Sequence, residues 1–387
     1  MNLTHAARAP SLLFSLLLPL LAGCRQQDFP SYPPDYREYV YVTNGASGTV
    51  TVIDAVNLRI DREIAVGPRP VAVAASRTRN EVYVVNSGSP AGQGSLSVLN
   101  AESNTVAATI PLQCQPVSID IGPHDNLAYI ANAASNTISV VDLKARRVVA
   151  TLASGEEPVK ARISPDGKSL VVPNRAAGSV TILDPAARSV RAVFENCPGA
   201  SDAVILPDST KAFVACSAGH QIMAIALAHS KFHPSQPDRL EALLDVGRAP
   251  VQLALKPDGG ELFVANSLSD NISEVVTGTD DVGGAYMIGD DPVRGLVTAN
   301  NALLYVANLH SQYVTIYAID DGRRAGAIHV GDGPSAMAFS AAGHLLFVVD
   351  TRSADVAVAR LSNRSLFTIL PTGRAPNAIA GKAFRLP

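Results

Sequence analysis

Short apolar runs rich in Val and Ile alternate with turn residues along almost the whole chain after residue 38. In the first unit these runs are 40–43, 49–53, 59–65 and 71–74, each of strand length and bounded by Gly, Pro or Asn. The runs are nearly continuous rather than strictly alternating, which is typical of sheets that are buried on both faces. No helical spacing competes with this pattern, so the sequence predicts β-strands grouped in fours.

One four-residue motif ends the same strand in every unit. It reads Tyr41-Val42-Thr43-Asn44 in the first unit, and its fourth position recurs at residues 44, 86, 132, 174, 216, 266, 308 and 350. The steps between copies are 42, 46, 42, 42, 50, 42 and 42 residues. A period of this size, with four strands per unit and small insertions, predicts a β-propeller.

The order of strands within a unit predicts how the ring closes. The run after each proline turn is expected to be the inner strand of a blade. Eight such runs begin at Val71, Val117, Val159, Ser201, Val251, Val293, Ser335 and Asn377. The chain would open with the three outer strands of one blade and end with the inner strand of that same blade. We therefore predict an all-β, eight-bladed propeller over residues 39–387, with seven blades as the alternative.

The N-terminal residues have the layout of an export signal. A weakly basic start precedes an apolar stretch over residues 11–21, which is too short to span a bilayer. The following Leu21-Ala22-Gly23-Cys24 resembles the lipobox of bacterial lipoproteins. That resemblance implies cleavage before Cys24 and acylation of this residue. An ordinary secretory signal, in which Cys24 is incidental, is the alternative.

These features predict three regions: a lipoprotein signal peptide over residues 1–23, a tether over 24–38, and the propeller. The tether is predicted from its three prolines and its lack of apolar periodicity. Arg25 follows the Cys, where lipoprotein sorting to the inner membrane would need Asp. We expect an exported, membrane-anchored protein that faces the periplasm or the cell surface, with the outer membrane favoured.

The repeat itself resembles a known family. Tyr41-Val42-Thr43-Asn44, the following Thr49-Val50-Thr51-Val52-Ile53-Asp54, and the turn Val66-Gly67-Pro68-Arg69-Pro70 are similar to the YVTN-type β-propeller repeat. The resemblance covers essentially everything after residue 38. It implies the fold, but little about function, because propellers of this kind include lactonases, amine-oxidising subunits, haem d1 proteins and surface-layer modules.

A polar arc is expected at the start of neighbouring inner strands. The position two residues beyond the turn proline reads Ala72, Ser118, Lys160, Asp202, Gln252, Arg294, Ala336 and Ala378 along the chain. Two residues further on, Asp120 and Arg162 add charge to the same side. Lys160, Arg162 and Arg294 could hold a carboxylate or phosphate. The alternative is a salt-bridge network between blades, Lys160 with Asp202 or Arg162 with Asp120.

The cysteines predict a disulfide rather than a metal site. Cys197 precedes an inner strand and Cys216 ends the adjacent strand, so both are expected on one face of one blade. In an exported protein this proximity favours a disulfide. Cys114 would be left unpaired. A metal site built from Cys197, Cys216, His220 and His310 is disfavoured because its ligand spacing is loose.

Composition weakens several classes of function. The net charge is −3 without a basic tract, so no nucleic-acid partner is expected. The chain has no Cys-x-x-Cys-His, no Trp and no Gly-x-Ser-x-Gly elbow. We expect no catalytic residues, but a monomeric scaffold that binds a small anionic ligand or a cell-envelope protein. No cofactor is expected. A haem d1-like tetrapyrrole, with only His220 and His310 on the right face, and a lactonase-like hydrolase are the alternatives.

Overall fold

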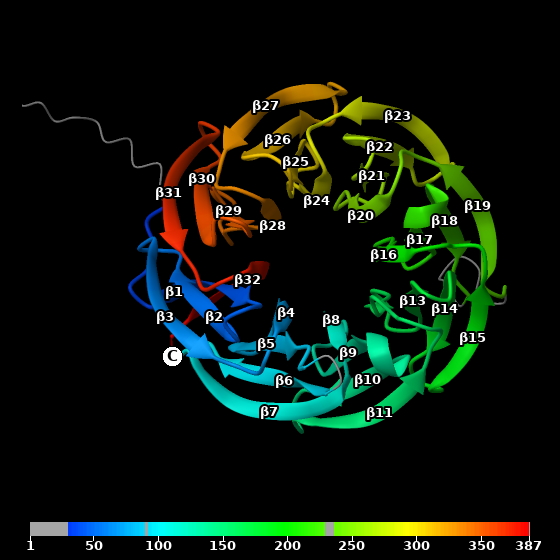
Figure 1. Ribbon diagram of the computed structural model, residues 1–387, viewed down its shortest axis with the longest axis horizontal. Helices are drawn as coiled ribbons and strands as arrows, with labels where there is room; N and C mark the ends of the chain where they lie inside the picture. The colour runs from blue at the N-terminus through cyan, green and yellow to red at the C-terminus, as the bar shows by residue number, and fades with distance from the viewer. Residues whose placement is uncertain (1–29, 90–91, 229–235, 387) are drawn as a thin grey trace, which may run out of the picture. The chain divides into compact units, whose positions relative to one another are not determined.

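The computed structural model describes residues 30–89, 92–228 and 236–386. The predicted signal peptide and Cys24 lie outside the described residues. By its internal contacts the chain divides into residues 1–31 and 32–387, and the second unit is an all-β ring of eight four-stranded sheets (Figure 1). The prediction of eight blades is therefore confirmed. Within the described ranges, no helix is long and apolar enough to cross a membrane.

Each blade is numbered here by the chain order of its inner strand. Blade 1 consists of β4 (Pro70–Ala75), β5 (Glu81–Asn86), β6 (Gln93–Asn100) and β7 (Thr105–Cys114). Blade 2 consists of β8 (Pro116–Ile121), β9 (Leu127–Asn132), β10 (Thr137–Asp142) and β11 (Arg147–Ala153), with the 3-10 turn η1 (Ala133–Ser135). Blade 3 consists of β12 (Arg162–Ile163), β13 (Leu170–Asn174), β14 (Ser179–Asp184) and β15 (Ser189–Phe194). Blade 4 consists of β16 (Ala200–Ile205), β17 (Lys211–Cys216), β18 (Gln221–Ala226) and β19 (Arg239–Asp245), with η2 (Ser217–Gly219).

The second half of the ring repeats this arrangement. Blade 5 consists of β20 (Pro250–Leu255), β21 (Glu261–Asn266), β22 (Asn271–Val276) and β23 (Asp281–Met287). Blade 6 consists of β24 (Pro292–Val297), β25 (Leu303–Asn308), β26 (Tyr313–Ala318) and β27 (Arg323–His329). Blade 7 consists of β28 (Pro334–Phe339), β29 (Leu345–Asp350), β30 (Asp355–Arg360) and β31 (Ser365–Pro371). Blade 8 combines β32 (Pro376–Arg385) with β1 (Tyr36–Asn44), β2 (Thr49–Asp54) and β3 (Arg59–Ala65).

The ring closes in blade 8, as the strand order predicts. β32 pairs antiparallel with β1 from Tyr36↔Arg385 to Asn44↔Pro376, so the two ends of the propeller complete one sheet. β1 begins at Tyr36, and the part of the chain assigned from sequence to the end of the tether, 36–38, is already strand. Glu38 is only 2% exposed there, and its Oε1 accepts a hydrogen bond from the N–H of Ala341 at 2.6 Å. A buried, bonded carboxylate fixes this end of the strand.

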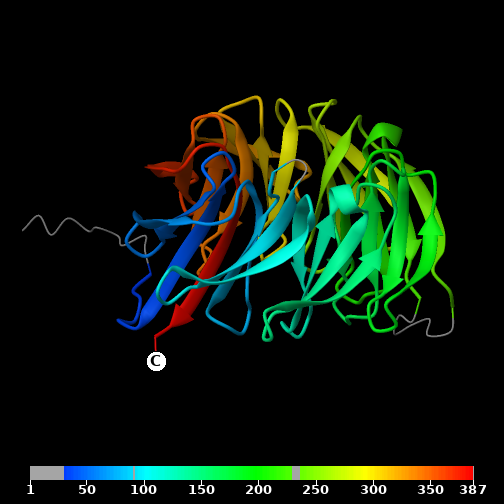
Figure 2. The same cartoon turned by 60° about the horizontal axis from the view of Figure 1, so that its bottom comes forward.

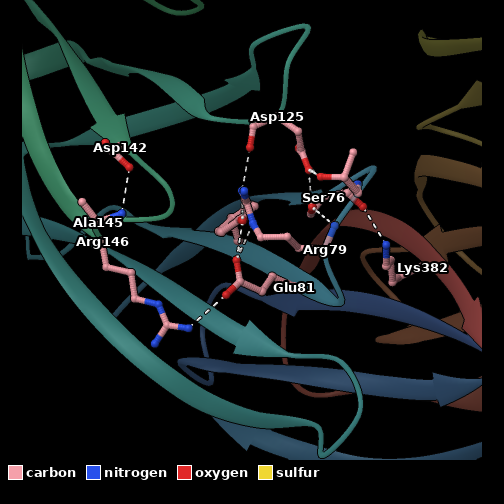
Figure 3. A network of polar contacts seen from close by, with 10 residues as sticks. Ser76, Arg79, Glu81, Asp125, Asp142, Ala145, Arg146 and Lys382 are labelled. Atoms are coloured by element: carbon pink, nitrogen blue, oxygen red, sulfur yellow. Dashed lines mark hydrogen bonds and ion pairs between the residues drawn. The ribbon is translucent and has the colours of Figure 1, made fainter. Parts of the chain in front are cut away.

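A polar network joins blade 8 to blades 1 and 2 beside the closure (Figure 3). Lys382 of β32 donates from Nζ to the backbone oxygen of Ser76 at 2.8 Å. The hydroxyl of Ser76 bonds to the Asp125 carboxylate in blade 2. Arg79 donates to the backbone oxygen of Asp125 at 2.7 Å and pairs with Glu81 at 3.1 Å. Because these bonds bridge three blades, they hold the closed ring together at this point.

The hydrophobic core lies between adjacent blades rather than inside any one of them. Where the ring closes, Tyr41 and Val50 of blade 8 pack against Val82, Val84 and Leu99 of blade 1. All five side chains are fully buried. Both faces of each sheet are therefore covered, which explains why the apolar runs in the sequence are nearly continuous.

The strands run between two faces of the ring (Figure 2). We call the face where the inner strands begin the Asn face, because the motif Asn residues end the neighbouring strands there, and the other the opposite face. In six blades the Asn Nδ2 donates to a Ser or Thr hydroxyl on the next strand, at 2.9 Å in each. The pairs are Asn44–Thr51, Asn86–Ser97, Asn132–Ser139, Asn174–Thr181, Asn266–Ser273 and Asn308–Thr315. The role of the motif Asn is therefore structural: it ties two strands of one blade together through a buried hydroxyl.

Blade 3 departs from the regular pattern, although the sequence predicts eight equivalent repeats. Its inner strand, β12, is only two residues long, and Val159 donates its N–H to the carbonyl of Pro173 at 3.0 Å. The N–H and C=O of one strand residue face the same neighbour, so the N–H that Pro173 lacks would have faced the inner strand. The proline therefore interrupts the ladder beside Lys160.

Candidate functional site

The predicted polar arc lies on the inner strands of blades 2 to 6, next to the axis of the ring (Figure 1). Asp202, Gln252 and Arg294 stand on β16, β20 and β24, Asp120 on β8, and Arg162 on β12. Lys160 precedes β12 in the interrupted stretch. Side chains from these inner strands bond to the neighbouring blade. Four of the six predicted residues form two ion pairs, and a fifth, Gln252, bonds to the backbone of the next blade.

Lys160 and Asp202 form an ion pair between blades 3 and 4. The Asp202 side chain is 2% exposed, and its Oδ2 also accepts the N–H of Leu253 in blade 5 at 3.0 Å. Burial disfavours the charged form of Asp202, but Lys160 and Arg162 outweigh that effect and hold its pKa below the usual range. Burial lowers the pKa of Lys160, and the attraction of Asp202 opposes this. The pair therefore links three consecutive blades.

Arg162 and Asp120 form a second, more open pair. Their Nη1 and Oδ2 atoms are 3.4 Å apart, and the Arg162 side chain is 35% exposed. Arg162 Nε also donates to the carbonyl of Ala203 at 3.3 Å, while Asp120 Oδ2 accepts the N–H of Ile163 at 3.0 Å. Burial opposes the charge of Arg162, yet Asp120 and Asp202 raise its pKa further. Both ion pairs that the sequence offers as an alternative to a ligand site are thus present.

Gln252 has a hydrogen-bond partner in the next blade, whereas Arg294 has none among the described residues. Gln252 Oε1 accepts the N–H of Gly295 at 2.6 Å, which links blade 5 to blade 6. Arg294 forms no hydrogen bond and no ion pair within 4.0 Å in the described part of the chain. Burial lowers its pKa, Asp202 opposes that effect, and the nearby charge of Arg162 adds to it. Three cations therefore share two carboxylates, which leaves an excess positive charge near the axis.

A cavity of about 400 Å³ lies where the inner strands of blades 1 to 4 end, at the opposite face. Its polar lining consists of Arg77, Asp120, Arg162 and Ser164, and its apolar lining of Ile121, Pro123, Ile163, Pro165 and Ile205. Arg77 was not foreseen from the sequence. Its Nη1 donates to the carbonyl of Gly122 at 3.3 Å. Arg77 is the second residue after β4, and a comparison of the second residue after each inner strand would have found it.

A second cavity, of about 480 Å³, opens at the Asn face. Arg175, Ser201, Ser217 and His220 give it polar groups, and Val251 and Leu268 give it apolar surface. His220 Nδ1 lies 3.2 Å from the N–H of Ala249, so this ring nitrogen is already engaged. The Leu268 side chain is 62% exposed at the rim. Arg175, the one guanidinium among its described lining residues, pairs with Glu157 at 3.3 Å.

Cys197 and Cys216 are joined by a disulfide, with Cα atoms 4.7 Å apart. Their sulfurs are therefore not available as metal ligands, and among the described residues no group of three or more His, Cys, Asp or Glu is placed to hold a metal ion. Cys114 is a free thiol at the end of β7.

A haem d1-like cofactor does not find an axial ligand near the axis. The inner strands, as described, contain no histidine. His220 bonds to the backbone as above, and His310 pairs with Asp291 through Nδ1 at 3.0 Å on the Asn face. The inner strands that the structure describes therefore offer Arg and Lys side chains, but no imidazole, to a macrocycle near the axis.

A family model described as "Lactonase, 7-bladed beta-propeller" matches residues 41–323, well over half of the chain. The chain belongs to this family. The description of the lactonase propeller family counts seven blades, whereas this member forms eight. The match ends where β27 begins, so blade 7 and the closing strand β32 lie beyond it. A search of the curated proteins found no match.

Solved structures share the fold of this lactonase-family chain at low identity. Hydrazine synthase of Kuenenia stuttgartiensis is 20% identical, with a TM-score of 0.57, and the alignment covers 72% of this chain and 92% of the other. A putative 6-phosphogluconolactonase from Bacteroides uniformis is 15% identical over 90% and 100%, with a TM-score of 0.61. The dihydro-heme d1 dehydrogenase NirN, in complex with DHE, is 12% identical over 91% and 76%, with a TM-score of 0.71. These likenesses show the fold alone.

Proposed function

We propose that this protein is an exported, lipid-anchored propeller that binds a small anionic ligand near its axis without transforming it. The observation that carries the proposal is the excess of positive charge along the inner strands of blades 3 to 6. Lys160 is held by Asp202, but Arg162 pairs only loosely with Asp120, and Arg294 has no carboxylate within 4.0 Å among the described residues. A carboxylate or phosphate would compensate these cations.

The cavity at the opposite face suits such a ligand. Its volume of about 400 Å³ lies within the range usual for small-molecule sites. Arg77 supplies a guanidinium group from blade 1 and Arg162 one from blade 3, and Ser164 supplies a hydroxyl. Each guanidinium carries five N–H donors in a planar fork, of which the described contacts use only a few. Two guanidiniums with spare donors can grip an anion at two oxygens.

The test is a calorimetric titration of the mature protein with gluconate and with inorganic phosphate. We expect binding that weakens about tenfold or more in Arg162→Gln and in Arg77→Gln, because a hydrogen bond to a charged group is lost. Arg323→Gln is the matched control, since Arg323 is 72% exposed on β27 and lies outside the cavity. No binding of either anion, or equal loss in the control, would refute the proposal.

Lactone hydrolysis is the second candidate, because the chain belongs to the lactonase propeller family. The cavity holds one carboxylate, Asp120, as a base that could activate water. This carboxylate already pairs with Arg162 and accepts the N–H of Ile163, so its oxygens are engaged before any water binds. Turnover of glucono-δ-lactone that is lost in Asp120→Asn would establish this function in place of simple binding.

The proposal includes a lipid anchor at the N-terminus and membership of the YVTN-type propellers. The lipobox-like Leu21 to Cys24 supports an anchor at Cys24, and the repeat supports kinship with YVTN-type propellers. A cell-envelope protein that docks on the ring is the partner we expect, with the propeller itself monomeric. Mass spectrometry of the N-terminal peptide should find acylated Cys24, and Cys24→Ser should release the protein from the membrane fraction.

A further inference from the structure

Two carboxylic acids replace the repeated amide contact in blade 7. Asp350 occupies the position of the motif Asn at the end of β29, and Asp355 faces it across the strand pair at the start of β30. In blade 5 the same two positions are Asn266 and Asn271, where Nδ2 donates to Oδ1 at 2.9 Å. Two carboxylates have no such N–H to share. Their contact therefore needs either a cation or a proton to offset the negative charge.

Within the described ranges, no Lys, Arg or His forms an ion pair with Asp350 or Asp355. Asp350 is 0% exposed, and its Oδ2 accepts the N–H of Gly331 at 2.9 Å. The Oδ1 atoms of Asp350 and of Asp355 are buried and receive no hydrogen bond from any donor in the described residues. A Cβ added to Gly331 would lie 2.7 Å from Asp350 Oδ2 and 2.7 Å from Asp355 Oδ1, so the two carboxyl groups meet beside this glycine.

The charged groups on the neighbouring elements do not change this picture. Asp332 lies in the turn that leads into β28, and Arg352 lies in the loop after β29. Arg352 pairs with Asp332, with Nη1 and Oδ1 3.7 Å apart. Burial, together with the neighbouring carboxyl of Asp355, raises the pKa of Asp350 to about 8, against the opposing N–H of Gly331. One proton on the pair is therefore the compensation available at neutral pH.

We propose that Asp350 and Asp355 form a proton-binding latch, which holds the turn 331–333 against blade 7 and loosens when the shared proton leaves. In the closed state the O–H of one carboxyl donates to an oxygen of the other. On release of the proton to solvent, two anions remain side by side in a buried place, and their repulsion pushes the strand ends apart.

The latch lies next to the closure of the ring. Thr351, the residue after Asp350, donates from Oγ1 to the carbonyl of Pro376 at 2.7 Å, where β32 begins. Its hydroxyl also lies 2.5 Å from that of Ser335 on the inner strand β28. Movement of the end of β29 therefore acts on the closing strand directly, so that alkaline conditions weaken the seal between blades 7 and 8.

The test compares the full chain with Asp350→Asn across pH. The variant restores the residue found in six other blades, with Asp355 as acceptor in the role of Asn271, so it is expected to fold. Where the folded state binds one proton more than the unfolded state, the unfolding constant rises by up to tenfold for each unit of pH increase. Relative to the variant, the wild type should lose stability as pH rises from about 4 to about 8, and no further above that.

A ratio of unfolding constants that stays unchanged between pH 5 and 9 overturns the proposal. Hydrogen exchange offers a second measurement that does not need reversible unfolding. The amides of residues 331–333 and of Asn377 and Ala378 should exchange at least tenfold faster at pH 9 than in Asp350→Asn, after correction for intrinsic rates. Stabilisation of the wild type but not the variant by millimolar Ca²⁺ at pH 7 would show a cation in place of the proton, which also overturns it.

Discussion

The disulfide between Cys197 and Cys216 stands where a glycine and an asparagine touch in five other blades. Gly67 against Asn86 is one example, in which an added Cβ would lie 2.8 Å from the amide group. Cys197 occupies the turn position of that glycine and Cys216 the position of the asparagine. A covalent bond therefore replaces a packing contact at the same joint between a turn and a blade.

Removing the disulfide should destabilise the ring. Cys197→Ser with Cys216→Ser should lower the free energy of unfolding by about 3 kcal/mol, because a loop of 19 residues is no longer closed in the unfolded chain. Restoring the repeat instead, with Cys197→Gly, Cys216→Asn and Met223→Thr, should recover part of this loss. Denaturant titration of both variants tests the point, and equal losses would show that the repeat contact contributes nothing at this joint.

The repeated Asn should contribute to stability at every copy. Asn132→Ala removes the 2.9 Å bond to Ser139 and leaves a buried hydroxyl without its donor. We expect a loss of about 1–3 kcal/mol. The control is Asn80→Ala, which removes an exposed bond to Glu102 and should cost less than about 0.5 kcal/mol. Thermal or denaturant unfolding would contradict the prediction if the two variants were alike.

The buried ion pair should behave asymmetrically when it is broken. Lys160→Met leaves Asp202 buried without its cation, at an expected cost of about 3–5 kcal/mol. Replacing both residues, Lys160→Met with Asp202→Leu, should restore much of the lost stability. A double variant less stable than the single one would contradict this account of the pair.

The same pair should make the free energy of unfolding fall at low pH. The folded-state pKa of Asp202 is lowered, so its contribution is present above the unfolded value of about 3.9 and is lost as pH falls through the folded value. Asp202→Asn should therefore unfold with a weaker dependence on pH below about 4 than the wild type. Chemical unfolding at a series of pH values checks this, and identical slopes would count against it.

The fold was within reach of the sequence because each blade repeats the same local rules. The spacing of the motif Asn, the apolar runs and the proline turns fix eight units, and the C-terminal run supplies the missing inner strand. Five of the six residues of the polar arc lie on inner strands, and Lys160 precedes β12. Whether its charges pair with each other or await a ligand depends on side-chain distances between blades, which spacing along the chain does not encode.

Three features of the sites could not be predicted, although their residues are visible in the sequence. Pro173 stands inside a motif strand, and its missing N–H explains the short β12. Asp350 departs from the Asn of the repeat, but its meaning depends on the contact with Asp355. Arg77 lies in a turn, and its side chain lines a cavity formed with other blades. Departures from a repeat were thus the signal, and their partners came only from the structure.

The most direct test of the central claim, that the axis of the ring binds a small anion, is native mass spectrometry of the mature protein purified gently from its own host. We predict a bound anionic mass at one copy per chain, absent from Arg162→Gln and retained in Arg323→Gln. A protein that carries no added mass, and gains none when gluconate or phosphate is supplied, would contradict the account.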